Sequence, residues 1–226
     1  MGPGCLMSSA FDAGDDCRGM WIAELGVMFR PDTRTSRQGA SYHAVRFYEN
    51  KASLCRLVAE FLGEGLAIGQ PALIIGTPEH RAAFADELRA RHFDVERLQA
   101  AGEVLMLDAR TSLATFMVDG IPDGDLFHAR TTASIAQLCR GRRDCTIRAY
   151  GEMVDLLWKD GESTAAVQLE MLWNRLATTH DFSLLCGYAM GNFYKDASVG
   201  DICHHHTHVI ASDGSACATL ARSSVN

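Results

Sequence analysis

The fold of this chain is decided by the stretch Arg148-Ala-Tyr-Gly-Glu-Met-Val-Asp-Leu-Leu-Trp158, which Leu169-Glu-Met-Leu-Trp-Asn-Arg-Leu176 and Ser183-Leu-Leu-Cys-Gly-Tyr188 follow. The pattern predicts strand, polar turn, helix, helix and strand. Polar residues interrupt these otherwise apolar segments, namely Arg148, Tyr150, Glu152 and Glu170. A buried charge is costly unless it is paired or used. These residues therefore predict an internal polar network or a functional site.

The same alternation extends outward along the chain. The apolar run Pro71–Gly76 has strand length and suits a strand with both faces covered. Further strands are expected at Ala44–Tyr48, Val104–Asp108, Thr146–Tyr150 and Phe182–Tyr188. Helices are expected at Ser53–Gly65, Glu79–Arg91, Ser112–Val118, Phe127–Cys139, Glu152–Trp158, Glu162–Thr178 and Asp201–Ile210. Alternating strands and helices predict a three-layer α/β fold, RecA-like or Rossmann-like, with a mostly parallel sheet between two helical layers.

Two further motifs precede this region, His43-Ala-Val-Arg-Phe-Tyr-Glu49 and a Gly-containing stretch from Phe61 to Pro78. With these in order, the chain resembles the MEDS family of sensory domains, named after methanogen and methylotroph regulators. The resemblance runs from about His43 to Val209. It implies a RecA-like architecture and detection of small molecules, including hydrocarbon derivatives. It also implies regulatory partners, since family members occur with histidine kinases, anti-sigma kinases or DNA-binding modules.

Composition limits the organisation and the functional class. We expect a flexible extension at residues 1–40 with an apolar patch at Met20–Phe29, one domain at 41–210 and a tail at 211–226. A net charge of −7 argues against direct nucleic-acid binding. The sequence has no membrane-spanning apolar run and no secretory signal, so a cytoplasmic location is expected.

The eight cysteines are scattered and form no C-x-x-C pair. Cys55, Cys139 and Cys186 fall in apolar patterns. We expect them to be small buried hydrophobic residues in a reducing compartment.

A nucleotide-hydrolysing site is not expected. A phosphate-binding loop needs G-x-x-x-x-G-K-[ST], whose amides and lysine hold the phosphates. The glycines between Gly63 and Gly69 lack that lysine, with Glu64 and Gln70 nearby instead. No G-x-S-x-G nucleophile motif surrounds Ser183 either.

A ligand pocket is the first candidate site. In open α/β sheets, ligands bind beyond the carboxyl ends of the strands. The mixture of aromatic and acidic residues expected there suits a small organic ligand better than a polyphosphate. In the alternative interpretation, Arg148, Glu152 and Glu170 pair in one internal network and the tyrosines cap the core. The predicted ligand-binding residues are Tyr48, Glu49, Thr77, Asp108, Arg148, Tyr150, Glu152, Glu170 and Tyr188.

A metal site is the second candidate, at Ile202-Cys-His-His-His-Thr-His208. If this segment is helical, Cys203 and His206 share a face, and His208 is a further donor. Cys203 and His206 also match positions that the MEDS family tends to carry as Cys and His. A stable zinc site needs more ligands, so His43 or His180 would have to come from elsewhere. The alternative is a solvated helix end.

We therefore expect a non-catalytic sensory or regulatory protein that binds a small ligand. It would signal through a histidine kinase, an anti-sigma factor or another regulatory protein, and self-associate as a homo-oligomer. Two alternatives stay open: a metal- or redox-responsive switch using Cys203 and nearby histidines, and an ATPase-like nucleotide-binding protein.

Overall fold

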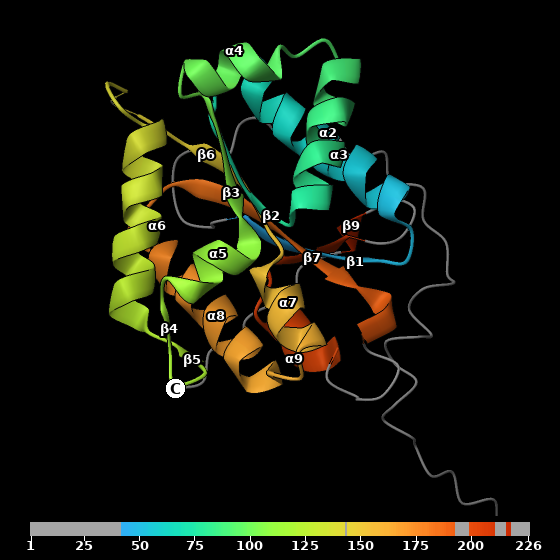
Figure 1. Cartoon of the computed structure of the whole chain (residues 1–226), viewed down its shortest axis with the longest axis vertical. Coiled ribbons are helices and arrows are strands. Elements are labelled where there is room, and N and C mark those ends of the chain that lie inside the picture. Colours follow the sequence, from blue (N-terminus) through green and yellow to red (C-terminus); the bar gives the residue numbers. More distant parts are fainter. Residues whose placement is uncertain (1–41, 143, 193–198, 211–215, 218–226) are drawn as a thin grey trace, which may run out of the picture.

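A computed structural model describes residues 42–142, 144–192, 199–210 and 216–217. Its main sheet has the strand order β3-β2-β6-β7-β1-β8-β9, with all neighbours parallel except β8 and β9 (Figure 1). The strands are β1 (His43–Tyr48), β2 (Ala72–Gly76), β3 (Val104–Asp108), β6 (Ile147–Gly151), β7 (Phe182–Ala189), β8 (His208–Ile210) and β9 (Ala216–Cys217). The predicted α/β fold with a mostly parallel sheet is confirmed.

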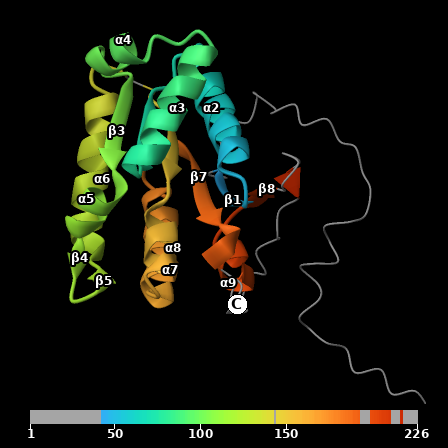
Figure 2. The same ribbon diagram turned by 45° about the vertical axis from the view of Figure 1, so that its right-hand side comes forward.

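Helices cover both faces of the sheet, as Figures 1 and 2 show. Along β2, Leu73 and Ile75 face one core, and Ala72 and Ile74 face the other, as the two-residue period of a strand requires. One core is covered by α2 (Lys51–Ala67), α3 (Pro78–Ala90) and α4 (Val95–Ala100). The other is covered by α5 (Ala109–Ala114), α6 (Gly124–Leu138), α7 (Met153–Lys159), α8 (Ser163–Leu176) and α9 (Val199–His204). A 3-10 turn, η1 (Met190–Asn192), follows β7.

Short capped connections lead from strands into helices. Asn50 accepts a hydrogen bond from Ser53 N at 3.1 Å at the start of α2, and Asp108 does the same for Thr111 N at 2.9 Å at the start of α5. Only Glu49 and Asn50 separate β1 from α2. A connection of this length cannot wrap around a phosphate group as a phosphate-binding loop does.

Three expected helices differ from the structure, namely 112–118, 201–210 and the end of 53–65. The helix predicted at 112–118 is wrong, because Asp108 caps α5 directly after β3 and the helix ends at Ala114. The chain then forms a hairpin of β4 (Met117–Val118) and β5 (Ile121–Pro122), whose turn Asp119-Gly120 has positive φ at both residues. Helix α4 was not expected from the sequence.

The last predicted helix, 201–210, is also wrong. Helix α9 ends at His204, and the β-branched residues Val209 and Ile210 belong to β8, which pairs with the edge of β1.

The glycines of α2 do not end that helix, contrary to expectation, but lie buried inside it. A Cβ atom on Gly65 would lie 2.3 Å from Cγ of Arg148. The Arg148 guanidinium carbon lies 4.9 Å from the centre of the Phe61 ring, and Nε donates to Gln70 Oε1 at 2.9 Å. Gly65 therefore allows Arg148 to cross the helix closely.

The cysteines were only partly predicted. Cys55 and Cys186 are buried thiols, as expected, whereas Cys139 forms a disulfide with Cys145. The expectation of a reduced Cys139 is wrong because the turn after α6 brings Cys145 back to the end of that helix.

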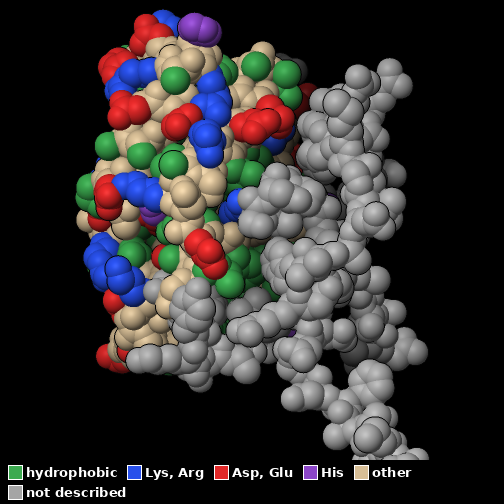
Figure 3. Space-filling view, turned by 90° about the vertical axis from the view of Figure 1, so that its right-hand side faces the viewer, with side chains coloured by type: hydrophobic (Ala, Val, Ile, Leu, Met, Phe, Trp, Pro, Cys, Tyr) green, Lys and Arg blue, Asp and Glu red, His purple; other side chains and the backbone are tan. Residues whose placement is uncertain are grey.

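Charged side chains of both signs are interspersed on the face shown in Figure 3. Arg89 of α3 pairs with Asp86 of the same helix and with Glu96 of α4, and Arg91, directly after α3, pairs with Glu87. No helix in the described part of the chain is long and apolar enough to cross a membrane. The predicted N-terminal patch at Met20–Phe29 lies outside the described residues, as does the predicted tail apart from β9.

Candidate functional site

The predicted ligand residues fall into separate groups. The first is the Glu152 cluster, formed by Thr77, His80, Tyr150 and Glu152 where β2 and β6 end. The Glu152 carboxylate is buried and accepts hydrogen bonds from Thr77 N, His80 Nδ1 and Tyr150 Oη, the last at 3.1 Å. Burial raises the pKa of Glu152, but the bonds from His80 and Thr77 outweigh burial and hold that pKa below its ordinary value.

The Glu152 cluster occupies the N-terminus of α3, a position where anions commonly bind. The N–H groups at a helix start attract phosphates and carboxylates. At the start of α3, Glu152 is itself the anion bound to Thr77 N–H. The chain thus occupies this position with one of its own side chains.

The remaining predicted ligand residues lie apart. Asp108 pairs with Arg81 at 3.2 Å, Glu49 is exposed, and Tyr48 is partly buried with its ring 5.9 Å from that of His80. Arg148 lies near the amino end of β6, within 3.9 Å of Glu64. Hence the expectation of one network joining Arg148, Glu152 and Glu170 is wrong, because the three side chains have different partners.

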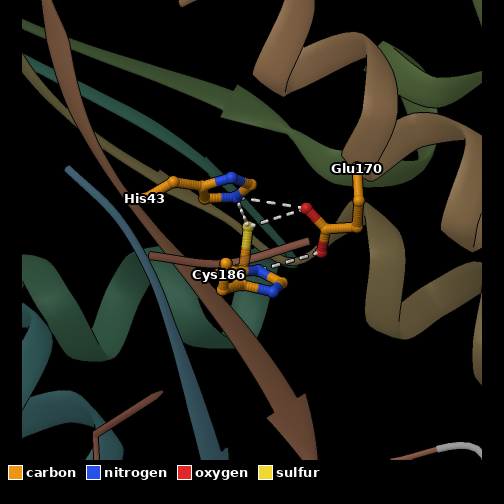
Figure 4. A group of neighbouring side chains, drawn as sticks. His43, Glu170 and Cys186 are labelled. Carbon is orange, nitrogen blue, oxygen red and sulfur yellow. Dashed lines mark hydrogen bonds and ion pairs between the residues drawn. The ribbon is translucent and has the colours of Figure 1, made fainter. Parts of the chain in front are cut away.

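Glu170 belongs to a second group, the four-donor cluster of His43, Glu170, Cys186 and His206. Their donor atoms lie within 4.8 Å of one another, and all four side chains are buried. Three of them are drawn with labels in Figure 4, converging from β1, α8 and β7. His206 comes from the turn between α9 and β8.

The distances inside the cluster are short. His43 Nε2 lies 3.2 Å from Glu170 Oε2 and 3.3 Å from Cys186 Sγ. His206 Nε2 lies 3.3 Å from Glu170 Oε1, without the geometry of a hydrogen bond. Tyr188 Oη donates to Glu170 Oε1 at 2.7 Å.

Neighbouring groups fix how both imidazole rings are oriented. His206 Nδ1 lies 2.7 Å from the carbonyl oxygen of Ile202, which can only accept, so Nδ1 carries the proton. His43 Nδ1 lies 3.1 Å from Asn174 Oδ1, and Asn174 Nδ2 donates to His205 O at 2.8 Å, which fixes the orientation of the amide. In their neutral forms both rings therefore direct the lone pair of Nε2 toward Glu170. Metal-binding histidines are held in this way by bonds to their other nitrogen.

The electrostatics of the cluster favour a cation. Burial raises the pKa of Glu170, but His206 and His43 outweigh burial and hold it well below its ordinary value, so the carboxylate is ionised. Burial and His206 lower the pKa of His43, so this ring is neutral near pH 7. Burial and Glu170 raise the pKa of the Cys186 thiol. The ionised carboxylate thus lies beside the Nε2 atoms of both rings, where a cation would balance its charge.

The shorter spacings in the cluster, whose donor atoms all lie within 4.8 Å of one another, are close to those around a metal ion. Tetrahedral zinc, with bonds of about 2.0–2.3 Å, holds its ligand atoms roughly 3.3–3.8 Å apart. The contacts of Glu170 with both rings and of His43 with Cys186 are 3.2–3.3 Å, and Cys186 Sγ lies 3.6 Å from Glu170 Oε2. Two imidazoles, one thiolate and one carboxylate would form a closed, four-ligand centre.

The predicted metal residues are thus brought together only in part. His206 joins the cluster and His43 arrives from β1, as the sequence allowed, whereas the donor atoms of Cys203 and His208 lie outside it. The helix that would have aligned Cys203 with His206 ends at His204. The ring of His208 packs instead against Tyr42, with centroids 4.7 Å apart. His180 contacts Thr179.

The sequence reasoning missed Cys186 as a metal ligand and placed Glu170 in a different group. A thiol within the apolar strand Ser183–Tyr188 and a carboxylate within the apolar stripe of α8 were the available signals.

Comparison with known proteins agrees with this fold. Residues 42–207 match the model of MEDS, the MEthanogen/methylotroph, DcmR Sensory domain. This chain belongs to the MEDS family. All members of the four-donor cluster lie within the matched residues of the MEDS domain. The sensory character of the family agrees with the expected sensory or regulatory role.

Among solved structures, the MEDS domain is similar to a KaiC-like protein, PH0186, from the hyperthermophilic archaeon Pyrococcus horikoshii OT3. The TM-score is 0.50 at 12% sequence identity, covering 74% of this chain and 70% of that chain. At this identity the similarity concerns the fold alone, and it supports the RecA-like architecture. None of the curated proteins matches this chain.

Proposed function

We propose that this MEDS domain is a non-catalytic sensor whose input is a divalent transition-metal ion, bound by His43, Glu170, Cys186 and His206. One observation carries the proposal. Two imidazole rings, each with Nδ1 bound to a protein oxygen, direct Nε2 toward the same buried carboxylate. A cation held between these nitrogens would balance the buried carboxylate, which is costly to leave uncompensated.

A metal ion fits the structure better than the small organic ligand expected from the sequence. Tyr150 and Tyr188 are completely buried, and their hydroxyl groups bind Glu152 and Glu170. Grooves on the described surface lie between α2 and α3 and beside Cys145, and neither is lined by these tyrosines. The ligand-binding roles predicted for them stay predictions.

The donor set favours zinc and argues for sensing without turnover. Histidine and cysteine suit Zn²⁺, which accepts tetrahedral geometry without preference from its d electrons. When the ion binds, Cys186 loses its proton, and the two negative charges of Cys186 and Glu170 balance the divalent ion. Four protein ligands leave no open position for a substrate, as is typical of structural rather than catalytic sites.

The bound ion would act through protein contacts. By resemblance to the family, the recipient is a regulatory protein such as a histidine kinase or an anti-sigma factor, and self-association accompanies signalling. The ion would stabilise one conformation of the domain, and the partner would distinguish that conformation from the metal-free one.

The test is metal binding by the full chain. After treatment with a chelator, the protein is titrated with Zn²⁺ or Co²⁺, and bound metal is measured by elemental analysis. We expect one ion per chain and, with Co²⁺, a thiolate-to-cobalt charge-transfer band. Cys186→Ser should remove the band, whereas Cys55→Ser, a change at another buried thiol, should keep it. A chain that binds no Zn²⁺ or Co²⁺, or a band that survives Cys186→Ser, would contradict the proposal.

A further inference from the structure

The four donors differ in how firmly the fold holds them. His43 lies on β1, Cys186 on β7 and Glu170 on α8, and each of these elements contributes more than one residue to the core beneath α5–α9. His206 lies between the six-residue helix α9 and the three-residue strand β8. We call residues Ile202–Ile210 the C-terminal clasp.

The clasp is attached mainly around His43. Thr207 N donates to His43 O at 2.7 Å, and His43 N donates to Thr207 Oγ1 at 2.9 Å. Strand β8 then pairs with β1 over only three residues, Ala44 to Arg46. Ile202 and Ile210 supply its buried apolar side chains.

Asn174 connects the clasp to the four-donor cluster. Its Oδ1 lies 3.1 Å from His43 Nδ1, and its Nδ2 donates to His205 O in the clasp at 2.8 Å. One amide group therefore orients a metal-ligating ring and holds the residue next to His206. The position of the clasp and the geometry of the ligands are joined by direct contacts.

We propose that the metal ion latches the C-terminal clasp onto β1, and that loss of the ion releases the clasp. This inference rests on the proposed function and specifies how the ion would change the conformation of the domain. The ion would bind three ligands on β1, α8 and β7 and one, His206, in the clasp, and so would connect the clasp to the sheet. Without the ion this connection is absent, and His206 can withdraw with the least loss of packing because the clasp pairs with β1 through only three residues.

Release of the clasp changes the edge of the sheet. In the structure, β8 covers the outer edge of β1. After release, backbone N–H and C=O groups of β1 lose their partners and become accessible to water. The signal would thus be the state of one edge of the sheet.

Hydrogen–deuterium exchange of the full chain tests the latch. Exchange is compared in chelator and in free Zn²⁺ at about 100 times its dissociation constant. We expect clasp amides, and those of β1 that face β8, to exchange roughly a hundredfold more slowly with zinc, because the ion lowers the metal-free population by that factor. Peptides from α3 should keep their exchange rates. In the His206→Ala variant the clasp should exchange rapidly with or without zinc, whereas His180→Ala, at a partly buried histidine outside the four-donor cluster, should behave as the unmodified chain does.

The outcomes separate the latch from the proposed function. If zinc binds at one ion per chain but clasp exchange is the same in zinc and chelator, the latch is wrong and metal sensing stands. Equal slowing in the clasp and α3 also overturns the latch, since the ion would then stabilise the whole domain. If no zinc binds, the proposed function fails and the latch fails with it. These comparisons use the unmodified chain, so they hold even if His206→Ala does not fold.

Discussion

Replacing Glu170 by glutamine should stabilise the metal-free domain and reduce the stabilisation that zinc gives. Glutamine keeps the shape of the side chain but adds a donor. With its carbonyl oxygen at the position of Oε1, it can still accept from Tyr188 Oη, now 2.7 Å away. The amide N–H then takes the position of Oε2 and can donate to His43 Nε2, now 3.2 Å away. The contact with His43 becomes a hydrogen bond, and a buried charge disappears.

The size of this effect follows from buried ion groups in other proteins. Their replacement by well-packed neutral residues is often neutral or stabilising by about 1–4 kcal/mol. We expect about 1–2 kcal/mol here, because the amide still buries polar atoms. The melting temperature of the metal-free domain should rise by about 2–8 °C, at about 2–4 °C per kcal/mol for a domain of this size. Zinc at 100 times its dissociation constant should add about 2.7 kcal/mol to the unmodified chain and much less to Glu170→Gln.

Urea unfolding in chelator and in zinc measures the stability of the metal-free domain and the stability gained with zinc. Glu162→Gln, at an exposed position directly before α8, is the control. The refuting result is a metal-free Glu170→Gln variant that loses about 3–5 kcal/mol, the loss seen when one partner of a buried ion pair is removed. His43 or His206 would then carry a second proton, and the cluster would be an ionic network without need of a metal.

Three further predictions concern the Glu152 cluster and the nucleotide question. Glu152→Ala should lower the free energy of unfolding by about 3–5 kcal/mol, since three donors lose their buried acceptor. Glu64→Ala, at a half-exposed carboxylate 3.9 Å from Arg148, should cost less than about 1 kcal/mol. Similar losses for both variants in urea unfolding would contradict the network around Glu152. The pKa of Glu152 is lower in the folded than in the unfolded chain, so its contribution to stability is present above the unfolded pKa of about 4.3 and is lost as pH falls through the folded pKa. Glu152→Gln should therefore lose stability less steeply than the unmodified chain below about pH 5 in acid titrations. An unchanged profile would argue against this linkage. The chain should not hydrolyse ATP, because only two residues join β1 to α2 and Glu152 occupies the start of α3. An ATPase activity, measured as phosphate release, that copurifies with the protein and is lost on mutation of residues 49–51 would disprove this.

The fold could be predicted from the sequence because its evidence is local. The apolar run Pro71–Gly76 and the helical stripe of α8 each identify an element without knowledge of the others. Elements set by distant pairing were missed. Strand β8 exists because β1 offers it an edge, and its residues taken alone suggested a helix.

The candidate site was less predictable because its residues meet only in three dimensions. Glu170 and His206 attracted attention as polar residues in their segments, but their proximity depends on where α8 and the clasp lie against β1. Cys186 looked like any small hydrophobic residue of a buried strand. The supposed network of Arg148 with Glu152 failed for a related reason: the two side chains lie toward opposite ends of β6, which spacing along the sequence does not reveal.

The close approach of Arg148 to Gly65 has a consequence for how relatives of this protein can evolve. A methyl group at position 65 would meet the arginine side chain at 2.3 Å, and one at position 187 would meet the Tyr150 hydroxyl at 2.6 Å. Each glycine is therefore tied to one large partner. Substitution at position 65 should be inherited together with a shorter side chain at position 148, and positions 187 and 150 should change together in the same way. An alignment of family members would then show two covarying pairs, each joining a glycine to a residue far away in the sequence.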